Sequence, residues 1–285
     1  GSGYAPSGSF TAQVVLPVEG DYQLTVVATD AKGQSSPSTS RTVFFNLAPP
    51  NAPVDFSAET RATGKIHLSW VVPGGKTPVS YRLYRSPSAV ALSSGVTPGS
   101  GLRVATGLTV TALDDTPPTD GVYYYGATSL DSSGNESGLS EVASALSDRV
   151  APTAAIATAT GTVTTGSYPL TFTLSKPLAS VPILLFVANG AGPQAVSLSA
   201  SSPTVWTGTL TVTAATAYGA ATFQFQGTDF AGNSGTSITA GRTLFVDNRG
   251  PIGAVTLYPF SPLKAGEADL ALILDEPAVS TPTLA

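Results

Sequence analysis

The sequence predicts an all-β chain built of tandem β-sandwich domains, and three observations lead to this prediction. A strand-and-turn pattern occurs three times and reaches its turn at Asp30, Asp131 and Asp229. These aspartates follow one another at 101 and 98 residues, a period close to the size of one sandwich domain. The 29 glycines and 23 prolines interrupt any long helical periodicity, and no segment has the pattern of a capped helix.

The clearest copy of the pattern runs from Tyr123 to Ala145. Its first eight residues alternate in character, so one face of a strand can be buried at period two. Residues 131–135 (DSSGN) then end the strand with turn-forming side chains, and a second strand follows. The other copies are 22–30 and 223–229, each followed by a glycine and an amide residue.

Proline-marked joints divide the chain at the same period, at Pro50, Pro152 and Pro251. We expect four parts: 1–48, the C-terminal half of a sandwich; 49–150 and 151–249, two complete sandwiches; and 250–285, the N-terminal half of a further one. Two sets of sequence matches to the segment 151–249 support the two half-sandwiches. The alternating strands 10–16 and 41–46 resemble 206–212 and 242–247, and the strand 270–274 resembles 170–174.

The composition narrows the function. Charged residues make up 11% of the chain, against about 25% in ordinary soluble domains, which favours a polar, neutral extracellular or cell-surface protein. The net charge of −5 argues against nucleic acid as a partner, because the sequence has no basic stripe to neutralise phosphates. The chain has no cysteine, so disulfides and thiolate metal sites are excluded. No apolar run approaches ~18 residues, so we expect no membrane insertion of this segment.

Residues 52–148 carry a recognisable set of motifs. Trp70 ends an alternating strand, Tyr123 opens another, and a D-x-x-G-N-x-S sequence begins at Asp131. In these features the segment resembles a fibronectin type III domain of the bacterial kind. The resemblance implies that Trp70 packs the core and that Tyr123 forms a tyrosine corner. The small residues Gly126 and Ala127 depart from the family pattern, where larger residues are commoner.

The flanking segments resemble bacterial immunoglobulin-like repeats. In 151–249 an alternating strand runs into Lys176-Pro177, and the segment closes at 247–251 with a joint of the D-N-x-x-P kind. The strand before Glu276-Pro277 repeats the first feature. The resemblance implies a rod-like array of immunoglobulin-like and fibronectin type III sandwiches, with half-repeats in 1–48 and 250–285.

Few residues are candidates for catalysis. His67 is the only histidine, and its place on an alternating strand points it away from the side of Trp70. Asp114 and Asp115 are adjacent, so as strand neighbours they would face opposite ways, and we expect them in a turn beside the following prolines. We therefore expect no catalytic residue, no cofactor and no enzyme activity.

The turn aspartates Asp30, Asp131 and Asp229 are candidates for calcium, because carboxylate and carbonyl oxygens suit a hard cation. Each turn offers one carboxylate, so we prefer a turn in which the aspartate accepts backbone N–H bonds. Asn135-Glu136-Ser137 is a glycosylation sequon, and the turn explains the same residues. Exposed tyrosines leave surface glycans open as partners, although Tyr81 and Tyr84 should face opposite sides of a strand.

These observations favour a non-catalytic structural or adhesive stalk segment of a large bacterial surface protein, with assembly into a surface fibre as one expectation. The alternatives are a linker or accessory module of a secreted polysaccharide-degrading enzyme and a phage decoration domain. The expected partners are other protein domains or copies of the chain itself, end to end. The half-domains are completed either by a longer chain or by a neighbouring copy, which would generate a filament.

Overall fold

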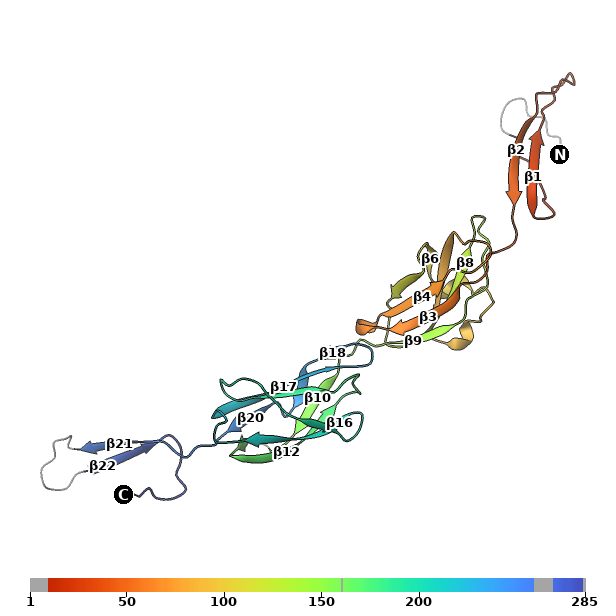
Figure 1. The fold of residues 1–285 in the computed structure, drawn as a ribbon. Helices are drawn as coiled ribbons and strands as arrows, with labels where there is room; N and C mark the ends of the chain where they lie inside the picture. The colour runs from red at the N-terminus through yellow and green to blue at the C-terminus, as the bar shows by residue number, and fades with distance from the viewer. Residues whose placement is uncertain (1–9, 160, 259–268, 284–285) are drawn as a thin grey trace. The chain divides into compact units, whose positions relative to one another are not determined.

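A computed structural model describes residues 10–159, 161–258 and 269–283 (Figure 1). The chain divides into two compact units, Gly1–Arg149 and Val150–Ala285. Each unit contains one complete β-sandwich and one separate two-stranded hairpin. The predicted all-β class is confirmed, while the four domain boundaries stay predictions. The described residues include no helix long and apolar enough to cross a bilayer.

The sandwich of the first unit has a three-stranded sheet and a four-stranded sheet. The first has the order β3-β4-β7, with bounds Val54–Thr60, Ile66–Val71 and Ala112–Asp115. The second has the order β6-β5-β8-β9, with bounds Arg103–Leu108, Ser80–Ser86, Gly121–Leu130 and Ala143–Ser147. Three short 3-10 turns complete it: η1 (Ala62–Gly64), η2 (Ala89–Ala91) and η3 (Ser100–Leu102).

The core of this sandwich lies between the two sheets. Alternation along β4 buries Ile66, Leu68 and Trp70 and turns the residues between them outward. Trp70 is 4% exposed; its ring lies 5.9 Å from that of Phe56 and 5.6 Å from that of Tyr81. The core position predicted for Trp70 is confirmed.

Tyr123 begins the buried run of β8. Its hydroxyl lies 2.8 Å from Oγ1 of Thr119, four residues upstream, so the side chain ties the start of the strand to the preceding loop. This is the local arrangement that a tyrosine corner predicts, except that the partner here is a side chain.

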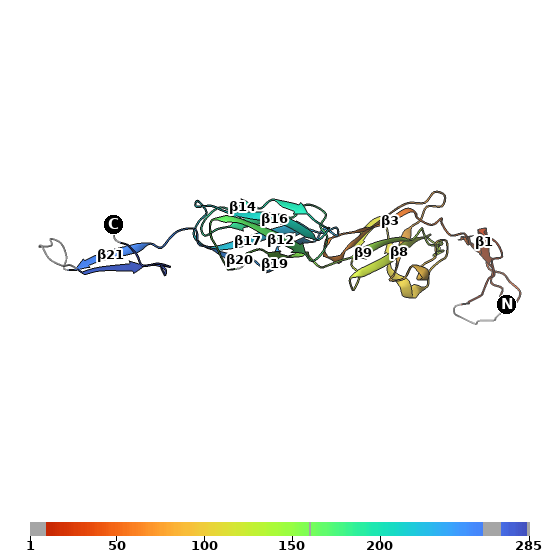
Figure 2. The ribbon, with the colours of Figure 1, turned by 90° about the horizontal axis from the view of Figure 1, so that it is seen from below.

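The sandwich of the second unit has two larger sheets (Figures 1 and 2). The five-stranded sheet has the order β15-β16-β12-β10-β19, with bounds Leu198–Ala200, Val205–Val212, Gly166–Leu174, Thr153–Ala157 and Ser237–Ala240. The other has the order β11-β20-β17-β13-β14, with β18 also paired to β17; the bounds are Thr162–Val163, Thr243–Val246, Gly219–Thr228, Ile183–Val187, Gln194–Ala195 and Ser234–Gly235.

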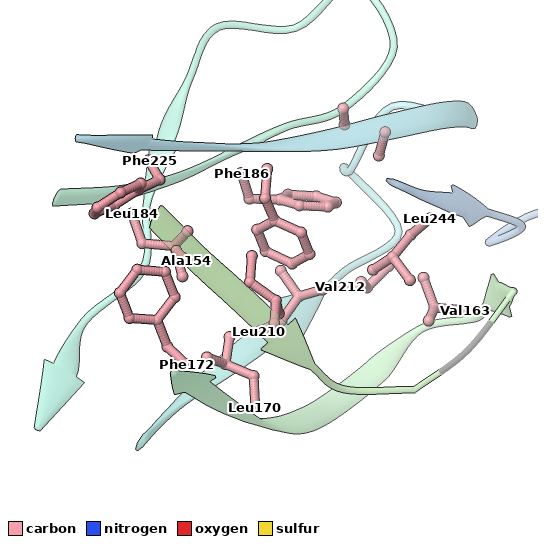
Figure 3. Packing of buried hydrophobic residues seen from close by; sticks show 14 of the residues in the cluster. Ala154, Val163, Leu170, Phe172, Leu184, Phe186, Leu210, Val212, Phe225 and Leu244 are labelled. Carbon is pink, nitrogen blue, oxygen red and sulfur yellow. The ribbon is translucent and has the colours of Figure 1, made fainter. Parts of the chain in front are cut away.

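Alternating side chains from both sheets fill the core of this sandwich. Figure 3 shows several of them, among them Phe172 of β12 and Phe225 of β17. These two rings meet edge to face with their centroids 5.4 Å apart. The inner face of β12 therefore packs against β17, and buried residues of β10 and β20 belong to the same core.

The hairpin of the first unit pairs β1 (Gly20–Val26) with β2 (Thr39–Phe45). Its register is that of β17 and β20: Gly20 faces Phe45 as Gly219 faces Val246. The strand predicted over residues 10–16 is wrong, because these residues form no strand. The physical reason is the lack of a partner: the matching strand β16 is held between β12 and β15, and the described residues give the hairpin no counterpart of either strand.

The hairpin of the second unit pairs β21 (Gly253–Tyr258) with β22 (Asp269–Leu274). Its register is that of β10 and β12: Gly253 faces Leu274 as Ala154 faces Leu174. The strands expected in this segment are therefore present, and the described part of the hairpin pairs only within itself.

Candidate functional site at the aspartate turns and chain joints

The three predicted turns share one hydrogen-bonding pattern. In each, the aspartate Oδ1 accepts the backbone N–H groups two and four residues later, at 2.8–2.9 Å. The backbone N–H of the aspartate donates to the carbonyl four residues later, and its own carbonyl accepts from the glycine N–H. The glycines Gly33, Gly134 and Gly232 have φ of 83°, 85° and 88°, which favours glycine at this position. Each aspartate forms its turn with its own neighbours in the chain.

The turn at Asp131 also binds a lysine and the chain before the sandwich. Asp131 Oδ2 accepts from Lys76 Nζ at 2.6 Å, from Asn46 Nδ2 at 2.7 Å and from Asn135 Nδ2 at 2.9 Å. The Asp131 side chain is only 2% exposed, whereas Lys76 is 36% exposed. Hydrogen bonds from Lys76, and then from Asn135 and Asn46, outweigh burial and hold the pKa of Asp131 well below its ordinary value.

The turn at Asp229 repeats this arrangement in the second unit. Asp229 Oδ2 accepts from Lys176 Nζ at 3.1 Å and from Asn233 Nδ2 at 3.1 Å. The aspartate is 3% and the lysine 22% exposed. Burial opposes ionisation of Asp229, but the hydrogen bonds from Asn233 and Lys176 outweigh it, and the pKa of this carboxyl is lowered.

Both lysines also bind a carbonyl of a chain joint. Lys76 Nζ donates to the Ala48 carbonyl at 2.7 Å, and Lys176 Nζ donates to the Val150 carbonyl at 2.5 Å. Each carbonyl lies two residues before the joint prolines Pro50 and Pro152. A buried aspartate, a lysine and a joint carbonyl thus form one connected cluster, which we call the joint clamp; it occurs once in each unit.

In the joint clamp of the first unit, Asn135 adds a second link to the joint. Its Nδ2 donates to the Asn46 carbonyl at 2.9 Å as well as to Asp131. The amide nitrogen of the predicted sequon is therefore engaged in two hydrogen bonds, which supports the turn interpretation of these residues. Glycosylation at Asn135 stays the less favoured alternative.

The geometry of the turns bears on the choice between turn chemistry, which the sequence favours, and calcium binding. Calcium takes six to eight oxygen ligands, but Oδ2 of Asp131 and of Asp229 faces an ammonium and amide N–H donors. Asp30 is exposed and, among the described residues, accepts the backbone N–H groups of Lys32 and Gln34. No cluster of three or more acidic, histidine or cysteine side chains suited to a metal occurs in the part of the chain that the structure describes. The arrangement supports turn chemistry, and calcium binding stays open to a direct test.

The histidine lies on a strand, as predicted. His67 Nδ1 lies 2.7 Å from Asp114 Oδ1 across the β4–β7 pair, with side-chain exposures of 36% and 49%. The hydrogen bond to His67 lowers the pKa of Asp114. The turn predicted for Asp114 and Asp115 is wrong: both belong to β7, because this segment completes the β3-β4-β7 sheet. Asp115 faces the opposite way, toward Arg85 and Tyr125 at 2.7 Å each.

Sequence reasoning missed a partly buried polar network on the outer face of β5 and β8. Glu136 accepts from the Tyr84 hydroxyl and from Thr128 Oγ1, each at 2.6 Å, and pairs with Arg82. Burial opposes ionisation of Glu136, but the bonds from Thr128, Tyr84 and Arg82 lower its pKa. Tyr81 instead packs in the main core, so the opposite orientation of the two tyrosines is confirmed.

Beside this network, Tyr84 packs with Leu92 and Leu139 in a small second core. The small residue Gly126 is required there, because a Cβ at that position would lie 2.7 Å from Leu139 Cγ. The departure of Gly126 from the family pattern was the available signal for this feature.

Comparisons with known proteins give no family. No protein-family model and no curated protein matches the chain. Among solved structures, the FN1–FN3 domains of chicken CNTN1 are similar at a TM-score of 0.39 and 15% identity, covering 78% of this chain and 74% of that chain.

Two structures from adhesion proteins are also similar. A tetra-tandem repeat in the extending region of a large adhesion protein has a TM-score of 0.33 and 12% identity, and the match covers 90% of this chain and 71% of that chain. A structure from a 1.5-MDa bacterial ice-binding adhesin has a TM-score of 0.29 and 15% identity, and the match covers 81% of this chain and 76% of that chain. The fold class of this chain rests on its own strands and cores.

Proposed function

We propose that the chain is a non-catalytic structural or adhesive stalk segment of a large bacterial extracellular or cell-surface protein. The observation that carries this proposal is the joint clamp, which occurs in both units with the same three chemical groups. A lysine that binds both the sandwich and the joint carbonyl restricts rotation of the joint. Short joints with prolines act in the same direction, because proline fixes φ and extends the backbone.

The composition supports the same role. A chain with 11% charged residues and many small polar residues presents a neutral surface. Its partners in this proposal are other protein domains or further copies of the chain, joined end to end. Fold alone does not identify function, so the proposal depends on joint stiffness, which is measurable.

Small-angle X-ray scattering tests the proposal. Wild-type chain and the double variant Lys76→Met/Lys176→Met are compared in dilute solution, with Lys65→Met as the control for a lost surface charge. We expect a narrow distribution of molecular dimensions for the wild type and the control, and a broader one for the double variant. A wild-type distribution of molecular dimensions as broad as that of the double variant would contradict a stiff stalk.

A further inference from the structure

We propose that the hairpin β1–β2 of one chain packs face to face against the hairpin β21–β22 of a second copy, forming a composite sandwich that links copies head to tail. The inference names a partner for the proposed stalk. The biological purpose of the contact rests on the proposed function, but its geometry does not. Its geometry comes from the complete sandwich of the second unit, in which both strand pairs have counterparts.

The hairpin β1–β2 has an uncovered inner face. Because its register matches β17–β20, the side chains of Tyr22, Leu24, Val26, Val43 and Phe45 stand at the positions of buried residues in that pair. In the sandwich these positions are filled by Ala221, Phe223, Phe225, Leu244 and Val246, all 7% exposed or less. Val26 is 63% exposed in the hairpin, and the other four are half-buried.

The hairpin β21–β22 has the complementary inner face. Its register with respect to β10–β12 places Val255, Leu270, Leu272 and Leu274 at the positions of Ile156, Leu170, Phe172 and Leu174. Leu272 and Leu274 lie on the same face, since a Cβ added at Gly253 would lie 2.7 Å from Leu272 Cδ1 and 2.9 Å from Leu274 Cδ2. Val255 is 57%, Leu270 44% and Leu272 38% exposed, whereas the four sandwich residues are at most 5% exposed.

In the complete sandwich these two faces cover each other. β17–β20 and β10–β12 belong to different sheets, and the contact of Phe172 with Phe225 lies between them (Figure 3). By the registers above, Leu272 of one copy would meet Val26 of another at the position of that ring contact. Burying apolar surface of this kind stabilises an interface by about 25 cal/mol per Å² before the costs of association.

A second copy also explains the lack of a strand over residues 10–16. Their counterpart β16 pairs with β12 along its whole length, from Gly166 to Thr173. In the composite sandwich, β22 of the partner copy stands where β12 stands, so it offers residues 10–16 a strand edge that no described strand of their own chain gives them. The interface joins two different surfaces, so it is heterologous and continues from copy to copy.

Sedimentation velocity of the 285-residue chain over a wide concentration range tests the inference. Leu24→Asp places a charge on the inner face of β1–β2, and Leu272→Asp places one on the inner face of β21–β22. Phe44→Asp and Ile273→Asp are matched controls on the outer faces of the same hairpins, where Phe44 and Ile273 are 60% and 66% exposed. Thermal melts followed by tryptophan fluorescence check that both sandwiches remain folded.

We expect wild type and controls to form species larger than a monomer as concentration rises, and each inner-face variant alone to lose them. An equimolar mixture of the two variants should form a dimer and nothing larger, because it holds one intact face of each kind. A wild type that stays monomeric, a Leu24→Asp chain that still associates, or a mixture without dimer overturns the inference. None of these results alters the scattering test of joint stiffness, which is made on dilute chain.

Discussion

Lys76 Nζ lies 2.6 Å from Asp131 Oδ2 while donating to the Ala48 carbonyl, so one ammonium group joins a buried turn to the chain in front of the sandwich. The pair Lys176–Asp229 repeats the relationship with the Val150 carbonyl. The lysines are separated by 100 residues and the aspartates by 98, so the arrangement follows the domain period. The repeat in the sequence therefore includes the contacts of the joint as well as the sandwich fold.

Replacing Lys76 by methionine should destabilise the sandwich of the first unit. Methionine keeps most of the side-chain volume but removes the charge, and the nearly buried Asp131 carboxylate loses its strongest donor. The melting temperature should fall, with a smaller change for Lys65→Met, whose side chain is exposed. Differential scanning calorimetry measures both. Equal melting temperatures for the two variants would show that the ammonium contributes no more than a surface charge.

The sandwiches should lose stability in acid. The pKa values of Asp131 and Asp229 are lowered from an ordinary 3.8 in the folded state, so their contribution is complete above that value. It is lost as pH falls below about 4 toward the folded-state pKa, because the unfolded chain then binds more protons. Urea unfolding between neutral pH and pH 3 should show this fall, and Asp131→Asn together with Asp229→Asn should flatten it. An unchanged slope in that double variant would assign the acid sensitivity to other groups.

Calcium should have no effect on stability if the aspartate turns act only through their hydrogen bonds. Because lysine and amide donors already face Oδ2 of Asp131 and Asp229, a chelator should leave the melting temperature unchanged. Melts with added calcium and with chelator decide the question. A calcium-dependent rise that disappears in Asp229→Ala would establish the metal site instead.

The sequence predicted the turns that repeat along the chain and the strand faces that follow from alternating side chains. Alternation placed Trp70 inside and His67 outside, and the D-x-x-G pattern predicted each turn, because these features depend on neighbours in the chain. The joint clamp was not predicted, because Lys76 and Asp131 are 55 residues apart and only the folded sheets bring them together. The absence of a strand over residues 10–16 was missed for the converse reason: a strand needs a partner, which its own sequence does not supply.

Deletion of the core tryptophan should be costly. Trp70→Ala removes a buried ring in contact with Phe56 and Tyr81, and the loss should be ~3–5 kcal/mol. Tyr123→Phe removes only the hydrogen bond to Thr119 and should cost about 1 kcal/mol. Denaturant unfolding of the 285-residue chain, read from the transition of the first unit, gives both values. A Trp70→Ala transition at the wild-type midpoint would refute the core assignment.

Adding one methyl group at Gly126 should destabilise the small second core. The new Cβ would stand 2.7 Å from Leu139 Cγ, so Leu139 or β8 has to move, at a cost of about 1–3 kcal/mol. Gly99→Ala is the matched control, because a Cβ there meets nothing within 4 Å. In a double-mutant cycle, Leu139→Ala should remove most of the penalty of Gly126→Ala, since the clash then has no partner. Additive effects of the two substitutions would mean that Gly126 serves backbone conformation rather than the approach of Leu139.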